Sequence, residues 1–233
     1  MDRFARAATM IAEAVEARVC PSAALAVGVK DRLCLCVAHG YANVIGNPVP
    51  VDLDTQYDLA SLTKIFATTM VTLRMIEEGR LRLEDTLDRF FDTNPVKSTI
   101  TIQQLLTHTS GLPASIPLYE HTRSPYAAEK LILSTPLVCA PGEQVVYSCM
   151  GFILLGKILE QVGLMPLDLL AQKYVFHPLN MFSTSYLPKG VNIACTEVVD
   201  GRPIKGVVHD ENARFLGGVS GNAGVFSNIG DCV

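Results

Sequence analysis

The sequence predicts an α+β fold, in which an antiparallel sheet is flanked by helices and the chain carries a large helical insertion. The order of the patterns supports this prediction: a helix and a hairpin come first, a long helical block follows, and short strand-like pieces return near the end. Of the 233 residues, 49% are apolar and 18% are charged. This balance supplies a core and excludes disordered and low-complexity chains.

The first elements are a helix and a hairpin. Within residues 4–15, apolar side chains recur on one helical face, which predicts an amphipathic packing helix. These side chains are Phe4, Ala8, Ile11 and Val15. Glu13 and Glu16 interrupt the apolar stretch before it reaches the length of a signal peptide, so we expect an untargeted, cytoplasmic protein. Residues 23–30 and 33–38 are two apolar runs separated by charged residues, which predicts a hairpin.

The middle of the chain is mainly helical. A long helix is predicted from Ser61 to Gly79, since glycine is a natural residue to end a helix. Shorter helices are predicted at residues 102–106 and 151–162, and residues 111–125, rich in proline and serine, are predicted as loop. Residues 191–233 return to short, glycine-rich strands.

These patterns predict a single domain, residues 1–233, with two lobes. Residues 1–60 and 191–233 are expected to form an α/β lobe, and residues 61–190 a mainly helical lobe. The glycine-rich segment 217–224 matches neither a dinucleotide-binding motif nor a phosphate-binding loop, and we interpret it as a flexible turn.

Charge and cysteine usage exclude several classes of protein. The net charge is -4 and the basic residues are scattered, so no nucleic-acid or membrane partner is expected. The seven cysteines are odd in number and contain no CxxC pair, which favours reduced thiols. His209, Asp210 and Glu211 are adjacent and cannot converge on one ion on a regular element, so no metal or cofactor is expected.

The chemistry of the chain is indicated by an S-x-x-K tetrad, Ser61-Leu62-Thr63-Lys64. On a helix these two side chains share a face, and the serine lies near the positive end of the helix dipole. Serine needs a base to become a nucleophile, and a desolvated lysine can be that base. With 12 serines and 8 lysines, chance gives about 0.4 such tetrads. The tetrad alone is therefore weak evidence, because Ser61 can also be an ordinary helix cap.

Six segments, of which the first contains the tetrad, resemble the β-lactamase-related serine hydrolases in their order along the chain. This family includes class C β-lactamases, low-molecular-mass penicillin-binding proteins, D-amino-acid peptidases and carboxylesterases. The segments are YDLASLTK from Tyr57, LRLED from Leu81, ITIQQLLTHTSGLP from Ile100, PGE from Pro141 leading to Tyr147-Ser148, FHPLNM from Phe176, and VHDENA from Val208. The resemblance extends from about residue 20 to the C-terminus.

The resemblance implies a catalytic set of Ser61, Lys64 and Tyr147. Ser61 would be the acylated nucleophile and Lys64 its base, and Tyr147, the tyrosine of a Y-x-N motif, would share the proton transfer. Tyr41-Ala42-Asn43 is a literal Y-x-N, but it precedes the tetrad whereas the family motif follows it. We therefore interpret Tyr41 as a turn residue.

The sequence departs from the family pattern at two points. Cys149 stands where the family has the asparagine of Y-x-N, which contacts the substrate amide, and a thiol is a weaker donor and acceptor. The chain also contains no K-T-G motif and no tryptophan, and none of its histidines begins an H-x-G. By the resemblance, that motif lies on a late strand that supplies an oxyanion donor. We therefore expect a C-terminally truncated member whose terminal strands are missing.

Two functions remain open. The first is a serine hydrolase that acts through a Ser61 acyl-enzyme on small esters, β-lactams or D-Ala-type peptides. The second is a truncated or degenerate relative that only binds a small ligand. In either case, we expect the open sheet edge left by the missing strands to promote self-association.

Overall fold

The computed structural model describes residues 4–233. Its N-terminal part is a helix followed by a hairpin sheet, as the sequence predicts. The elements are α1 (Ala5–Glu16), β1 (Ser22–Val29), β2 (Arg32–Asn43) and β3 (Val49–Pro50). They form an antiparallel sheet in the order β1-β2-β3, and α1 packs on β1 and β2. The apolar face of α1 is half-buried against the hairpin, which confirms the predicted packing helix.

The helices of the central block follow one another along the chain. They are η1 (Ala60–Leu62), η2 (Lys64–Thr69), α2 (Met70–Glu77), η3 (Leu87–Arg89), α3 (Pro95–Ser98), α4 (Ile102–Leu106), α5 (Leu118–His121), α6 (Pro125–Ser134), α7 (Cys149–Gly163), α8 (Leu167–Ala171) and η4 (Gln172–Phe176). The first three are continuous over residues 60–77, here called the nucleophile helix after its predicted nucleophile, Ser61, and η2 within it is a π-helical turn. Such turns occur frequently at functional sites.

The remaining elements are short. They are β4 (Tyr57–Asp58), β5 (Ser185–Tyr186), β6 (Glu197–Val199), β7 (Arg202–Ile204), α9 (Glu211–Phe215) and β8 (Val225–Ser227). A second small sheet has the order β4-β8-β5, and β6 pairs with β7 as a separate hairpin. The short sheet joins residues 57–58, which lead into the nucleophile helix, to residues 225–227 near the end of the chain. The division into the two predicted lobes stays a prediction.

The main core lies around α7 and includes side chains from most of the helical block. Nine residues of α7 are buried, among them Phe152, Ile153 and Leu154, and Met75 from the nucleophile helix packs against them. Each fully buried leucine or isoleucine contributes about 1.5–3 kcal/mol. A sheet, a helical body and strands from both ends of the chain confirm the predicted α+β class.

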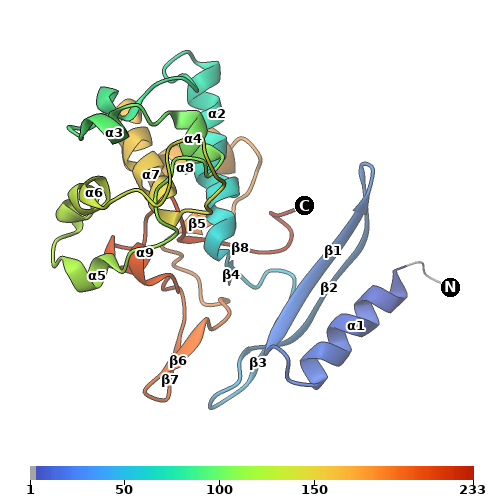
Figure 1. Cartoon of the computed structure of the whole chain (residues 1–233). Helices are drawn as coiled ribbons and strands as arrows, with labels where there is room; N and C mark the ends of the chain where they lie inside the picture. The colour runs from blue at the N-terminus through green and yellow to red at the C-terminus, as the bar shows by residue number, and fades with distance from the viewer. Residues whose placement is uncertain (1–3) are drawn as a thin grey trace.

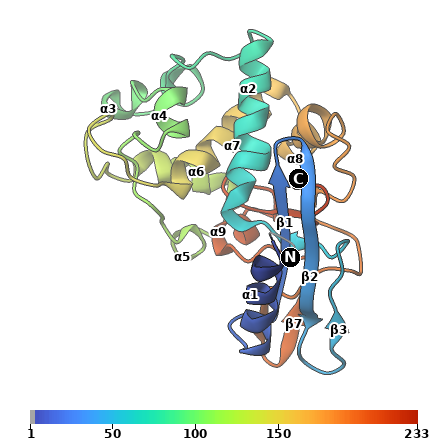
Figure 2. The ribbon, with the colours of Figure 1, turned by 90° about the vertical axis from the view of Figure 1, so that its right-hand side faces the viewer.

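The hairpin sheet with α1 lies to one side of the helical body (Figure 1). The view turned by 90° looks onto that side, so the hairpin lies in front of the helical body there (Figure 2). Within residues 4–233, β1 pairs with β2 and with no other strand. The backbone N–H and C=O groups on its other edge therefore form no hydrogen bonds to a neighbouring strand in this part of the chain. A row of unpaired backbone groups is a template for another strand. Self-association through this edge stays a prediction.

Two local expectations are corrected by the structure. The hairpin turn is formed by Lys30 and Asp31, because Arg32 already belongs to β2. Tyr41 lies in β2 opposite Pro50, so it is a strand residue and not a turn residue. The apolar run at the end of β2 thus continues as strand into the segment that its glycine and asparagine content predicts as turn.

We compared the described helices with the length and apolar character that a membrane span requires. No single helix among them is long and apolar enough to do so. One pair, Cys149–Gly163 with Leu167–Phe176, meets that criterion by length and composition alone, with a bend of 77° between its members.

Candidate active site

Ser61 lies in the first turn of the nucleophile helix and is exposed to solvent. The residue before it, Ala60, has a left-handed φ of +46°, which costs roughly 1–2 kcal/mol for a residue with a Cβ. The Asp58 carboxylate compensates by accepting from the Ala60 N–H at 2.8 Å. Its other oxygen accepts from the backbone N–H of His209 at 2.7 Å. Asp58 therefore fixes the turn from which Ser61 projects.

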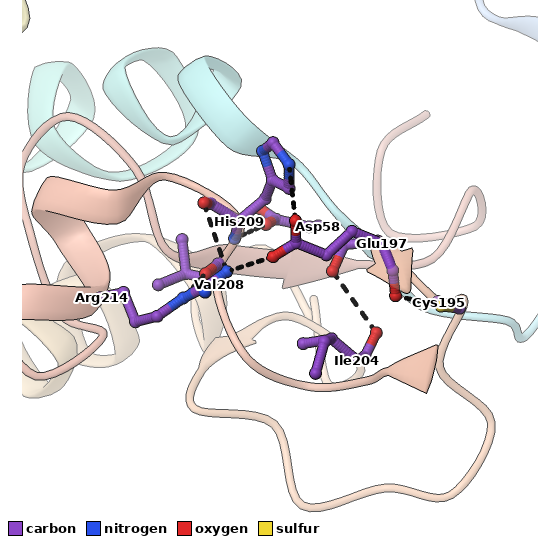
Figure 3. A network of polar contacts seen from close by, with 8 residues as sticks. Asp58, Cys195, Glu197, Ile204, Val208, His209 and Arg214 are labelled. Atoms are coloured by element: carbon purple, nitrogen blue, oxygen red, sulfur yellow. Dashed lines mark hydrogen bonds and ion pairs between the residues drawn. The ribbon is translucent and has the colours of Figure 1, made fainter. Parts of the chain in front are cut away.

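The segment that begins with His209 reaches this turn through a polar network (Figure 3). Glu197 accepts from Arg214 at 2.8 Å and lies 3.7 Å from the His209 ring nitrogen. The bond from Arg214 holds the pKa of the Glu197 carboxyl below its usual range. Since the backbone N–H of His209 donates to Asp58, this network helps to hold the turn at residues 58–61 in place. Within residues 4–233, no group of three His, Cys, Asp or Glu side chains is arranged to hold a metal ion.

Lys64 is the buried partner of Ser61. Its side chain is 2% exposed, and its Nζ lies 3.0 Å from the Ser61 Oγ and donates to the Asn222 carbonyl at 2.9 Å. The position three residues after Ser61 brings both side chains to one helical face, as the tetrad predicts. A neutral amine at this place can turn its lone pair towards the Ser61 hydroxyl and still donate one of its two N–H groups to the Asn222 carbonyl. This geometry suits the transfer of a proton from serine to lysine.

The aromatic ring of Tyr147 lies beside the Lys64 amine. The Nζ of Lys64 is 5.1 Å from the centre of the Tyr147 ring, and the side chain of Tyr147 is half exposed. In the described part of the chain, no hydrogen bond joins the Tyr147 hydroxyl to Lys64 or Ser61. The structure brings the three predicted catalytic residues together, and the proton-transfer role of the hydroxyl stays a prediction.

The loop that carries Tyr147 is held by residues of the LLTHTSGLP segment. Buried Ser148 donates its backbone N–H to the His108 Nδ1 at 3.0 Å and its hydroxyl to the Pro113 carbonyl at 2.7 Å. The same hydroxyl accepts from the Gly151 N–H and caps α7. The backbone N–H of Cys149 donates to the Ala114 carbonyl at 2.8 Å. This segment and the following residue, Ala114, therefore hold the loop that carries Tyr147 in place.

Cys149 is the first residue of α7. It is partly buried, and its side chain packs against the main core. Among the described residues, no hydrogen bond of its thiol is formed. A thiol is a weaker hydrogen-bond donor and acceptor than a carboxamide. Its role as a substrate contact stays a prediction.

The glycine-rich segment 217–224 differs from the flexible turn that its composition predicts. From Ser220 onward it is buried, and it runs between the nucleophile helix and α7. Thr68 donates to the Gly221 carbonyl at 2.7 Å, and Tyr186 donates to the Ser220 carbonyl at 3.1 Å. A Cβ placed on Gly221 would lie 1.9 Å from the Phe152 carbonyl oxygen. Small residues are needed here for close approach of two backbones.

Sequence reasoning did not identify two groups of the site. One is the carbonyl of Asn222, which holds Lys64, and the other is the Nδ1 of His108, which holds Ser148. A backbone carbonyl has no sequence signature, although the run of small residues around Asn222 is compatible with close packing. His108 lies within the most recognisable family segment, and its left-handed φ of +60° marks a constrained position.

Comparisons with known proteins show the family and the fold of the chain. The family model described as Beta-lactamase matches residues 7–233. A protein of Escherichia coli O157:H7, provisionally named D-alanyl-D-alanine carboxypeptidase, is 34% identical over 224 residues, which are 81% of this chain and 51% of that protein. The chain thus spans about half the length of the curated relatives it matches.

Solved structures show the same fold. An octameric penicillin-binding protein homologue from Pyrococcus abyssi has a TM-score of 0.82 at 24% identity, over 99% of this chain and 55% of that one. EstCE1, a hydrolase with promiscuous acyltransferase activity, has a TM-score of 0.76 at 24% identity, over 98% of this chain and 70% of that one. With a family model that covers nearly all of its length, the chain belongs to the β-lactamase family.

Proposed function

We propose that this chain is a serine hydrolase that forms an acyl-enzyme on Ser61. The observation that carries the proposal is the pairing of exposed Ser61 with buried Lys64, whose Nζ lies 3.0 Å from the serine Oγ. Burial of a lysine without a carboxylate partner is costly, and Lys64 differs from the other buried lysine, Lys97, in that its Nζ lies beside a serine hydroxyl. Membership in a family with carboxypeptidase and esterase-like relatives supports the same reaction class.

In the proposed reaction, the Ser61 Oγ attacks the carbonyl carbon of the substrate and its proton passes to Lys64. The carbonyl oxygen becomes an oxyanion, which the backbone N–H of Ser61 can stabilise. Collapse of the tetrahedral intermediate breaks the bond to the leaving group. The leaving group takes the proton from Lys64, and the Tyr147 hydroxyl shares in this transfer. Water then attacks the acyl ester, returns the hydrogen to Ser61 and releases the acid.

The alternative is a non-catalytic relative that binds ligand. It is favoured by two features of the sequence, the absence of a K-T-G motif and the presence of Cys149 in the Y-x-N position. A second oxyanion donor typically contributes about 10²–10³ in rate. Without such a donor, we expect the 233 residues to bind a substrate and turn it over slowly.

Formation of a covalent adduct distinguishes the two functions. We expect incubation with a fluorophosphonate to add one mass increment to the intact chain, and peptide mapping to place it on Ser61. Ser61→Ala should remove the adduct, whereas Ser115→Ala, a change of an exposed serine outside the site, should leave it unchanged. An adduct on Cys149, or an equal adduct in Ser61→Ala, would contradict the proposal.

Restoring the family residue at position 149 should change substrate preference. We expect Cys149→Asn to raise acylation by a β-lactam or amide by about fivefold, since one recovered hydrogen bond is worth about 1 kcal/mol. Hydrolysis of a small ester, which depends less on an amide contact, should change less. The measurement is acylation rate with paired ester and amide probes, and Cys34→Asn on the exposed hairpin is the control. Equal responses of both probes would show that residue 149 does not contact the substrate amide.

A further inference from the structure

His108 is one of the residues that link the Tyr147 loop to the rest of the helical body, and it contacts the loop through both its ring and its backbone. Its Nδ1 accepts the backbone N–H of Ser148 at 3.0 Å, and its carbonyl accepts the N–H of Val146 at 2.8 Å. Its ring lies 4.4 Å from the ring of Tyr147 and 5.1 Å from that of Phe152, measured between centroids. One side chain and its backbone thus contact three consecutive residues centred on Tyr147.

We propose that His108 is a positioning residue that holds Tyr147 beside Lys64, and that it does so only as a neutral imidazole. The bond from Ser148 requires a lone pair on Nδ1, which places the ring hydrogen on Nε2. A protonated ring carries hydrogen on both nitrogens, so two donors would face each other at this contact. Protonation therefore separates Ser148 from His108 and loosens the loop that carries Tyr147.

The surroundings of His108 favour the neutral form. Burial lowers the pKa of His108 below its ordinary value of 6.5, and the Lys64 ammonium lowers it further. The titratable groups that face the ring are Lys64 from the nucleophile helix and Tyr147 from the loop before α7. The other ring in contact, Phe152 of α7, carries no charge. At neutral pH the imidazole is therefore an acceptor, and acid breaks the contact.

The same linkage affects stability. Because the pKa of His108 is lower in the folded chain than in the unfolded chain, the unfolded chain binds more protons between the two values. The contribution of His108 to the free energy of unfolding is complete above pH 6.5 and falls as the pH is lowered through this window.

Two substitutions distinguish the effect of the Nδ1 acceptor of His108 from the effect of its aromatic ring. His108→Asn places a carboxamide oxygen at the position of Nδ1, does not titrate, and tolerates the left-handed φ of +60°. His108→Phe keeps an aromatic ring against Tyr147 and removes the acceptor. The expected effect on Ser61 labelling rests on the proposed function. The contact between the Ser148 amide and the His108 ring can be measured without any reaction.

The experiment measures two quantities between pH 5 and 8. One is the protection of the Ser148 amide against hydrogen exchange, and the other is the rate of fluorophosphonate labelling of Ser61. In the parent chain, we expect amide protection to fall at least tenfold as acid protonates His108, and labelling to fall with it. His108→Asn should retain both in acid, and His108→Phe should lack protection at every pH and label at least tenfold more slowly at pH 7.5.

An acid decline in His108→Asn that equals that of the parent would overturn the inference, as would parent-like protection in His108→Phe. If the parent chain forms no adduct at any pH, the proposed function fails. The exchange of the Ser148 amide then still decides whether His108 holds the loop.

Discussion

Replacement of Lys64 by alanine is expected to slow acylation of Ser61 by about 10²–10⁴-fold, the usual contribution of a general base. The Nζ is the one amine within hydrogen-bond distance of the Ser61 Oγ among the described residues, and the Asn222 carbonyl fixes its direction. Lys64→Met, which nearly preserves the side-chain volume, should show the same loss. The measurement is the rate of adduct formation by intact mass.

Tyr147→Phe is part of the same expectation. It keeps the ring against Lys64 and His108 and removes the hydroxyl alone. We expect a loss of far more than tenfold if the hydroxyl shares the proton transfer. Lys173→Ala is the control, because Lys173 also lies over a tyrosine ring, that of Tyr174, but is exposed and remote from Ser61. Rates within a few-fold of the parent in both Lys64→Ala and Tyr147→Phe would mean that another group takes the proton.

The second large effect is expected on stability, from Gly221→Ala. The added Cβ would lie 1.9 Å from the Phe152 carbonyl oxygen and 3.0 Å from the Gly156 nitrogen, and both are backbone atoms of the buried helix α7. Neither atom can move aside as a side-chain end would, so the segment itself must shift. We expect a loss of about 3 kcal/mol or more, within the upper range of overpacking effects.

A shift of this segment also displaces the Asn222 carbonyl from Lys64, so labelling of Ser61 should fall as well. A loss of 3 kcal/mol corresponds to a Tm lower by about 6–12 °C for a chain of this size. Thermal and urea unfolding measure the change. Gly28→Ala is the control, since its Cβ would meet nothing closer than the Arg32 carbonyl at 3.7 Å. Equal stability of the two variants would contradict the close approach at Gly221.

The elements that the sequence determined are those whose residues interact with near neighbours. The apolar periodicity of the first helix and the alternating apolar runs of the hairpin depend on spacings of one to four residues. The tetrad belongs to the same class, because the distance between Ser61 and Lys64 follows from one helical turn. Residue order therefore predicted that Ser61 and Lys64 lie side by side, and their roles as nucleophile and base stay predictions.

Tertiary structure decided the contacts that join distant parts of the chain. Lys64 meets the carbonyl of Asn222 across 158 residues, and Ser148 meets His108 across 40 residues. The strands β4, β5 and β8 have two or three residues each, too few for a periodic pattern, and they pair only because the helical body brings them together. The segment at Gly221 reads as a flexible turn from its composition, but it is buried. Local propensity fixes which residues form an element, whereas close packing fixes which carbonyl meets a buried amine.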